Sequence, residues 1–298
     1  MERTSSLYKL RRKIQVLAHA LFPDEFMSKL YYWIVLRKKL ELKSPKTFNE
    51  KLQWLKLYYF PQNTLVIKCT DKYAVRDYIK EKGYGDHLVP LIGVWDSAED
   101  IEWSCLPDQF VLKCNHGCAY NIVCSDKSIL DREKAVQQLN SWLKEDFGVF
   151  NIEPHYSHIR PRRILCEEFL GEKIIDYKFF CFNGEPKFIY VSRDLIHDRQ
   201  AQIGFFYLDG QKMPLKRDDY TDISTIELPI FFDEMLAMAK KLCHEFPFVR
   251  VDFFLANSTY YFAELTFTPG ACMMPFNPHK YDVEWGDLLQ LPKIVSRV

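Results

Sequence analysis

The feature that most restricts the fold of this sequence is a predicted β-hairpin over residues 247–265, because it places charged side chains on apolar strands. In its first strand Arg250 and Asp252 share one face, and the apolar residues that alternate with them share the other. In the return strand Glu264 and Thr266 share one face. The hairpin therefore predicts a sheet with one apolar face and a second face on which two carboxylates and a guanidinium converge.

A three-residue turn centred on Ser258 would set Asp252 directly opposite Glu264 across the hairpin. Like charges in this position destabilise a sheet unless a neighbouring group neutralises them. A divalent cation removes the penalty, and oxygen ligands near phosphate suit Mg²⁺. Alternatively, Arg250 pairs with both acids, and the hairpin alone does not distinguish between these interpretations. The turn over residues 268–271 exposes backbone N–H groups that suit an anion.

Composition excludes a disordered chain, because 48% of the 298 residues are hydrophobic and 15% are aromatic, enough for two lobes with separate cores. The formal net charge of zero gives no reason to expect a nucleic-acid partner. Residues 1–56 nevertheless contain 13 Lys and Arg and 5 Asp and Glu, so this segment carries +8 and the remainder −8. The basic segment predicts at most a weak contact with a membrane surface. For its helix at 47–57, an ordinary solvated face is favoured over one that binds anionic lipid or a polyanionic substrate.

The cysteines and the amino-terminal residues predict a cytoplasmic protein with free thiols. The nine cysteines, an odd number, show no disulfide-like spacing. Residues 1–13 are polar and basic, unlike a secretory signal, and the longest apolar stretch, 30–36, is too short to span a bilayer. His116 lies among four cysteines whose spacing differs from the Cys-x2-Cys pairs of zinc sites. Free cysteines are therefore expected at these positions: Cys105, Cys114, Cys118 and Cys124.

The order of helical and strand patterns predicts an α+β fold of two lobes that meet near residue 160. Helices are expected over residues 1–65, with breaks at Pro23 and Pro45, and over 71–82, 131–144 and 231–246. Besides the hairpin, strands are expected over 88–94, 109–114, 121–124, 163–169, 176–182, 186–191 and 204–208. The predicted organisation is a helical segment over 1–65, a first lobe over 66–160 and a second lobe over 161–298.

Three further groups of residues favour a nucleotide site, although each is weak alone. Lys113 interrupts an apolar strand, and a lysine there needs a charged partner such as a phosphate. Glu167 and Glu168 close another apolar strand, whose end can present backbone groups to an adenine and a carboxylate to a ribose. Asp176 and Lys178 share a strand face, and a surface ion pair is the favoured interpretation for them in isolation.

In their order along the chain, these pieces resemble the ATP-grasp superfamily. Arg250-Val-Asp252, Glu264-Leu-Thr266 and the Pro269-Gly270 turn are similar to the magnesium-binding hairpin of these ligases, including D-alanine–D-alanine ligases. The resemblance implies that ATP binds between the two lobes. It also implies that Asp252, Glu264 and Thr266 hold Mg²⁺, with Thr266 in place of the usual Asn. Arg250 would contact the transferring phosphoryl group or the acyl intermediate.

The same resemblance implies contacts with ATP from other parts of the chain. Lys113 matches the lysine that holds the phosphates, and Lys178, beside Asp176, matches a second basic residue at the nucleotide. The flexible loop over the phosphates is matched by His116, Gly117 and Cys118. The hinge whose backbone groups bind adenine is matched by four residues: Glu167, Glu168, Phe169 and Leu170. Asp71-Lys72 resembles the start of the first ATP-grasp lobe.

More narrowly, the chain is similar to the branch associated with teichuronopeptide and other surface-polysaccharide biosynthesis, whose members are often labelled glycosyltransferases. The segments that carry this likeness are 44–54, 71–76, 110–116 and 177–184. The branch usually has a Trp soon after the segment resembling Tyr207 and Asp209, and this chain has none there. The resemblance implies an amide-forming ligase. It would activate the carboxylate of a uronic acid or amino acid, in a small molecule or polysaccharide precursor, as an acyl phosphate and couple it to an amine.

Three other functions remain open on the sequence. A metal-dependent sugar-nucleotide glycosyltransferase typically carries an Asp-x-Asp triplet, which this sequence lacks. A kinase of the same fold would phosphorylate a hydroxyl group instead of a carboxylate. A non-catalytic interaction protein is the third, because Thr266 and a glycine-poor loop at 116–118 depart from the superfamily pattern.

Overall fold

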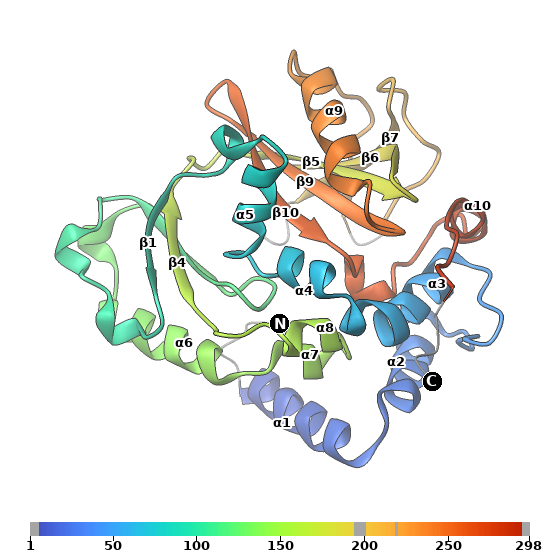
Figure 1. Cartoon of the computed structure of the whole chain (residues 1–298), viewed down its shortest axis with the longest axis horizontal. Helices are drawn as coiled ribbons and strands as arrows, with labels where there is room; N and C mark the ends of the chain where they lie inside the picture. The colour runs from blue at the N-terminus through green and yellow to red at the C-terminus, as the bar shows by residue number, and fades with distance from the viewer. Residues whose placement is uncertain (1–5, 194–200, 218–219, 294–298) are drawn as a thin grey trace.

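The computed structural model describes residues 6–193, 201–217 and 220–293, and its mixture of helices and two sheets confirms the expected α+β class. The smaller sheet is on the left in Figure 1 and the larger is at the upper right. Helix α5 (Val75–Glu81) lies between them in this view, and the first two helices of the chain run along the lower edge.

The smaller sheet has four antiparallel strands, in the order β1 (Leu91–Trp95), β4 (Ile164–Glu168), β2 (Phe110–Cys114) and β3 (Asn121–Cys124). Alternation in β2 buries Phe110 and Leu112 in the core of this sheet and turns Val111 and Lys113 to the opposite face. Helix α6 (Arg132–Lys144) contacts β2 on the core side and begins at Asp131, whose carboxylate accepts the backbone N–H of Lys134.

The position of strand β4 differs from the predicted division of the chain into two lobes at residue 160. It follows that position, yet it pairs with β1 and β2 in the smaller sheet. The reason is its apolar content, because Ile164 and Cys166 complete the core formed by Phe110 and Leu112. The larger sheet therefore begins only at β5.

The larger sheet has six strands, in the order β10 (Thr259–Thr266), β9 (Phe248–Ala256), β5 (Ile175–Phe182), β6 (Glu185–Arg193), β7 (Gln202–Tyr207) and β8 (Thr221–Asp222). Only the β7–β8 pair within the described chain is parallel. The Asn183-Gly184 turn joins β5 to β6, with both residues at positive φ. Helix α9 (Phe232–Cys243) packs on β5, β6 and β9 and buries Met235, Met238 and Leu242, which lie on one face of the helix.

The remaining helices connect the two sheets and surround their lower ends. They are α1 (Ser6–Leu21), α2 (Asp24–Leu36), α3 (Phe48–Trp54) with the π-helix Leu55–Tyr59, α4 (Thr64–Thr70), α5, α7 (Phe147–Phe150), α8 (Pro154–Ser157) and α10 (Lys280–Leu288). Single 3-10 turns cover Phe60–Gln62, Gly85–His87, Ala98–Asp100, Trp103–Cys105 and Lys127–Ile129. None of the helices in the described ranges is both long and apolar enough to cross a membrane.

The predicted helix at 47–57 is real, but its basic side chains are not a solvated or ligand-binding face. Thr47 and Glu50 form a capping box at its start, and Phe48 packs against the larger sheet. Lys51 donates to the carbonyls of Gly286 and Leu289 at 2.7 and 2.8 Å, and the fully buried Lys56 donates to that of Asn151. These lysines therefore join the amino-terminal helices to the rest of the fold.

The predicted helix at 71–82 begins four residues later than expected, at Val75. The carboxylate of Asp71 accepts the backbone N–H groups of Tyr73 and Ala74, which forms a turn before the helix. Its second oxygen accepts the side-chain amide of Asn115 at 2.9 Å. This turn fixes the backbone of Lys72 next to the loop that follows β2.

Candidate functional site

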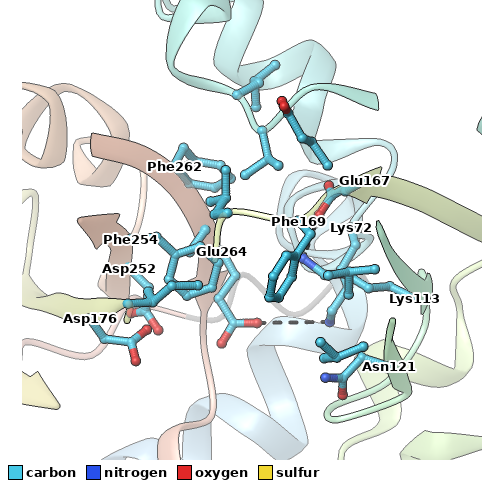
Figure 2. Close-up of a pocket in the computed structure, with 18 of the residues that line it drawn as sticks. Lys72, Lys113, Asn121, Glu167, Phe169, Asp176, Asp252, Phe254, Phe262 and Glu264 are labelled. Carbon is cyan, nitrogen blue, oxygen red and sulfur yellow. Dashed lines mark hydrogen bonds and ion pairs between the residues drawn. The ribbon is translucent and has the colours of Figure 1, made fainter. Parts of the chain in front are cut away.

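A cavity of about 400 Å³ lies between the two sheets, and side chains from both of them line it (Figure 2). Its apolar wall includes Leu88, Val89, Val111, Phe169, Leu170, Ile174, Phe254 and Phe262. The charged residues that line the cavity are four cations and six carboxylates: Lys72, Arg76, Lys113, Lys178, Glu167, Glu168, Glu172, Asp176, Asp252 and Glu264. The cavity therefore suits a ligand with a flat apolar part and an anionic part.

The two acids of the carboxyl-terminal hairpin are paired across the strands as predicted, but by a different route. Glu264 lies opposite Asp252 in the β9–β10 ladder. The turn has two residues, Asn257 and Ser258, both at positive φ, rather than the three expected. A one-residue bulge at Ala263 supplies the missing residue, so the register beyond it equals that of a three-residue turn.

Arg250 connects these acids into a hydrogen-bonded network. Its guanidinium donates to both oxygens of Asp252 at 2.7 and 2.6 Å and to the hydroxyl of Thr266 at 3.1 Å. It lies 3.6 Å from Glu264, which accepts the Thr266 hydroxyl at 2.9 Å. Arg250 thus pairs with both acids, as the alternative interpretation of the hairpin expected. Arg250 and Thr266 lie behind the cavity lining rather than in it.

Lys178 on β5 completes this network from the neighbouring strand, where it lies opposite Asp252. Its Nζ atom donates to Asp176 at 2.8 Å and to Asp252 at 3.3 Å, and Ser192 also donates to Asp176. The Asp176–Lys178 pair is buried, so the surface ion pair favoured from sequence is wrong. The cause is the position of β5 between β6 and β9, which covers this strand on both edges.

The two hairpin carboxylates differ in burial and in the direction in which their pKa values are shifted. Glu264 is partly exposed; burial raises its pKa, but Lys72, Arg250 and Lys178 outweigh this effect and hold the pKa at about 2. Asp252 is buried, which raises its pKa, although Arg250 and Lys178 oppose the shift. Burial lowers the pKa of Lys178, but the carboxylates of Asp176 and Asp252 outweigh it and raise the pKa above its ordinary value. The network therefore places an ionised carboxylate, Glu264, at the cavity surface.

On the opposite wall, Lys113 has a carboxylate partner from its own sheet. Its Nζ atom lies 2.5 Å from Glu167 on β4, which also accepts Arg76 at 3.3 Å. Arg76 in turn donates to the carbonyl of Val89. Lys72 donates to the carbonyl of Gly117 at 2.9 Å and lies 3.9 Å from Glu264, the contact drawn as a dashed line in Figure 2.

The residues predicted for the loop over the phosphates do not line the cavity. His116 is buried on the other side of the loop, where its Nε2 atom bonds the carbonyl of Trp142, and burial lowers its pKa to about 4. Gly117 lies against the Tyr120 ring, and Cys118 is 3.6 Å from the Tyr156 hydroxyl. Packing against α6 and α8 thus turns these residues away, and the lining comes from the residues that follow: Ala119, Tyr120 and Asn121.

Nine of the predicted site residues do line the cavity: Lys113, Glu167, Glu168, Phe169, Leu170, Asp176, Lys178, Asp252 and Glu264. Sequence reasoning missed two cations among the lining residues, Lys72 and Arg76. Lys72 lies in the turn that precedes α5 and Arg76 lies in the first turn of that helix, and in the sequence only the Asp71-Lys72 pair carries a likeness to the ATP-grasp pattern. It also missed Phe254 and Phe262, which are indistinguishable from core residues in the sequence.

The donor set at the hairpin fits a hard divalent cation with few protein ligands. Asp252 and Glu264 supply carboxylate oxygens, and Thr266 supplies a hydroxyl beside them. Across the described ranges, no group of three or more His, Cys, Asp or Glu side chains is arranged to hold a metal ion. Mg²⁺ commonly binds through one or two carboxylates together with substrate phosphates, so two acids are sufficient at this position.

Comparison with solved structures finds chains with a partial likeness to this one. D-alanine–D-alanine ligase from Bacillus anthracis, complexed with ATP, is 16% identical with a TM-score of 0.38, and the match covers 73% of this chain and 56% of that one. L-amino acid ligase from Bacillus licheniformis is 15% identical with a TM-score of 0.42, over 70% of this chain and 45% of that one. The chain thus spans about half the length of these proteins.

No curated protein matches the sequence. A family model described as TupA-like ATPgrasp matches residues 50–290, which include both sheets, the cavity and the acidic hairpin. Because this match covers most of the chain, the superfamily resemblance inferred from the sequence is confirmed. The chain belongs to the TupA-like ATP-grasp family.

Proposed function

We propose that this protein is an ATP- and Mg²⁺-dependent ligase that joins a carboxylate to an amine through an acyl phosphate. The observation that carries the proposal is the pairing of Asp252 with Glu264 at the charged wall of a cavity whose other wall is apolar. Adenine would occupy the apolar wall beside Phe169 and Leu170, and the phosphates would extend toward the lysines.

Asp252, Glu264 and Thr266 would hold Mg²⁺, which would neutralise charge on the phosphates when bound. Lys72 and Lys113 face the same wall from the smaller sheet and would orient the phosphates by charge-assisted hydrogen bonds. The guanidinium of Arg250, held by Asp252, would stabilise the charge that develops as the phosphoryl group is transferred.

The substrate carboxylate would attack the γ-phosphate of ATP, which releases ADP and leaves an acyl phosphate. An amine would then attack the acyl carbon and release inorganic phosphate as the amide forms. These steps require no protein nucleophile, since positioning and electrostatic stabilisation supply the catalysis. The two sheets would exclude water from the acyl phosphate, which would otherwise hydrolyse.

We further propose a role in cell-surface polysaccharide modification, with a uronic acid or amino acid as the carboxylate. This part is supported by the family assignment and by no individual residue of the site. A glycosyltransferase or a hydroxyl-directed kinase gives different products, so one assay tests all three.

The test is to incubate the protein with Mg-ATP and pairs of uronic acids, amino acids and amines, and to quantify ADP, phosphate and amide. We expect ADP and phosphate in equal amounts with the amide, and no turnover when EDTA removes Mg²⁺. Asp287→Asn, an exposed carboxylate on α10 that does not line the cavity, is the matched control for Asp252→Asn. A phosphorylated product without inorganic phosphate, AMP with pyrophosphate, or thermal stabilisation only by UDP-sugars would each contradict the proposal.

A further inference from the structure

Helix α1 turns its apolar stripe toward solvent. Leu10, Ile14, Leu17 and Leu21 repeat at intervals of four, three and four residues, so they lie along one face of the helix, and they are between 55% and 66% exposed. The opposite face carries Gln15, which is buried and donates to the carbonyl of Phe150 at 2.6 Å. A surface helix normally buries its apolar stripe, whereas α1 exposes its apolar stripe and buries a polar residue instead.

Helix α2 is arranged in the same way. Its inner face buries Met27, Ser28 and Tyr32, whereas the apolar residues of its outer face are between 38% and 54% exposed: Phe26, Leu30, Trp33 and Ile34. The two exposed stripes join at the turn between the helices, where the rings of Phe22 and Phe26 stack at 5.1 Å. Figure 1 places both helices at the lower edge of the molecule, and neither contributes a residue to the cavity lining.

This exposure is concentrated rather than scattered. Eleven of the eighteen exposed large hydrophobic side chains in the described ranges lie between Leu10 and Val35. Single exposed apolar residues are normal on protein surfaces, but a contiguous group marks a surface that another body covers. The term docking surface is used below for the exposed apolar residues of α1, α2 and the turn that joins them.

Basic side chains surround the docking surface. Those that are exposed are Arg11, Lys13, Lys29, Arg37, Lys38 and Lys39. The acids in this part of the chain are few and already paired, since Asp24 contacts His19 and Glu25 contacts Lys29 and Tyr58. An apolar face with Trp and Phe at its centre and Lys and Arg at its borders is typical of helices that lie in the plane of a bilayer surface.

We infer that α1 and α2 dock the protein on an anionic phospholipid bilayer, with the apolar stripes at the acyl boundary and the basic side chains on the headgroups. A second copy of the chain is a poorer occupant, because residues 1–56 carry a net +8 and two such segments would repel each other. The inference does not depend on the ligase proposal, since it concerns residues that do not line the cavity.

The experiment measures sedimentation of the full chain with vesicles of phosphatidylglycerol and phosphatidylcholine, and with vesicles of phosphatidylcholine alone. We expect binding to the anionic vesicles at low salt that weakens at high salt. Replacing Arg11, Lys13 and Lys39 with Gln should weaken it roughly a hundredfold, at about fivefold for each basic residue. The triple change Ile14→Ser, Leu17→Ser and Trp33→Ser should weaken binding by about a hundredfold or more.

The matched control is Ile129→Ser with Ile230→Ser, because these side chains are 79% and 90% exposed but lie on other parts of the fold. The control should bind vesicles as the unchanged protein does, and all variants should keep the same melting temperature. The inference is overturned if the protein ignores anionic vesicles at low salt, or if the α1–α2 apolar variant still binds them. It is also overturned if light scattering shows a dimer that this variant converts to a monomer, which would make the surface a contact between two copies.

Discussion

On the larger-sheet side of the cavity, Lys178 contacts two aspartates and its side chain is 9% exposed, whereas on the smaller-sheet side Lys113 contacts one glutamate and is 23% exposed. The first lysine is held in a closed network in which every charge has a partner. The second has a single counter-ion in the same sheet, Glu167, which Arg76 also contacts. Lys113 can therefore move to an anionic ligand while Glu167 keeps a cation beside it.

This difference indicates that the two walls of the cavity have different roles in binding. A charge that is buried and fully paired is pre-organised, because little reorganisation is left to occur when a ligand arrives. The Lys113–Glu167 pair is partly buried, but breaking it leaves Glu167 beside Arg76, so no buried charge is left unpaired. We expect the larger sheet to fix the position of the reacting groups and the smaller sheet to adjust around the nucleotide.

The largest effect should come from Asp252→Asn, which removes the charge shared by Arg250 and Lys178. Leaving these buried cations without it should reduce the free energy of unfolding by about 3–5 kcal/mol. ATP turnover should fall at least about a thousandfold. Calorimetry and the ADP assay measure the two quantities on the same preparation.

Glu264→Gln, in the same hairpin, should affect turnover much more than the free energy of unfolding. Because Glu264 is partly exposed, with Arg250 3.6 Å away, its loss should change the free energy of unfolding by less than about 1 kcal/mol. Turnover should still fall about a hundredfold or more. Equal destabilisation by both substitutions would contradict the contrast between a buried and a surface carboxylate.

The next prediction concerns Lys178, the cation that Asp176 and Asp252 share. Lys178→Met leaves Asp176 and Asp252 facing each other with only Arg250 as counter-charge, so the free energy of unfolding should fall by about 3 kcal/mol. Adding Asp176→Asn to this variant should restore part of the loss, because it removes the unpaired acid. A strictly additive double variant would mean that the two residues are not coupled.

A smaller effect is expected for Lys113→Gln on the smaller sheet. Stability should change by no more than about 1 kcal/mol, while ATP binding weakens about tenfold to a hundredfold because a charge-assisted hydrogen bond to phosphate is lost. Isothermal titration with Mg-ATP measures the affinity, and Lys134→Gln, on the exposed side of α6, is the matched control. Destabilisation as large as that of Lys178→Met would remove the distinction between the two walls.

The last prediction is a pH dependence of stability to which His116 contributes. Burial lowers its pKa from 6.5 to about 4, so the unfolded chain binds a proton in this window that the folded chain excludes. His116 alone should lower the free energy of unfolding by at most about 1.4 kcal/mol per pH unit as the pH drops from 6.5 to 4. The buried His155, whose pKa burial lowers to about 3, should add a contribution of the same sign. Glu264 acts at lower pH, since its contribution is lost only as the pH falls from 4.5 toward 2.

Denaturant melts of the unchanged protein and of His116→Gln over this range test the prediction. His116→Gln should reduce the slope between pH 6.5 and 4 by up to about 1.4 kcal/mol per pH unit. An unchanged slope in His116→Gln would mean that this buried imidazole does not titrate as its surroundings indicate.

The larger-sheet wall was more predictable from sequence than the smaller-sheet wall, and the reason is locality. Alternation within β9 and β10 fixes which faces Asp252 and Glu264 occupy, and the two strands are adjacent in the chain. Glu167, the partner of Lys113, lies 54 residues away on β4, and no local sequence pattern predicts that β2 and β4 are neighbours. The lobe boundary was misplaced for the same reason.

Orientation was harder to predict than secondary structure. The turn containing His116 follows β2 as expected, but packing of Trp142 from α6 decides that the imidazole faces inward. Similarly, the periodicity of Leu10, Ile14 and Leu17 predicts a helix without stating which side of it meets the core. In both cases a distant segment sets the direction, and periodicity within a segment carries no information about it.

The bulge at Ala263 divides the hairpin into two halves that differ by one residue in register. In the outer half the Asn257-Ser258 turn sets the register of β10, whereas in the inner half the bulge places Glu264 opposite Asp252. Strand β9 pairs with β5 along both halves and is therefore held independently of the tip. Changes in the length of the tip are therefore absorbed before they reach the acids. For protein engineering this makes the tip a permissive insertion point, where a short peptide carrying a fluorophore would report on the site without displacing its ligands.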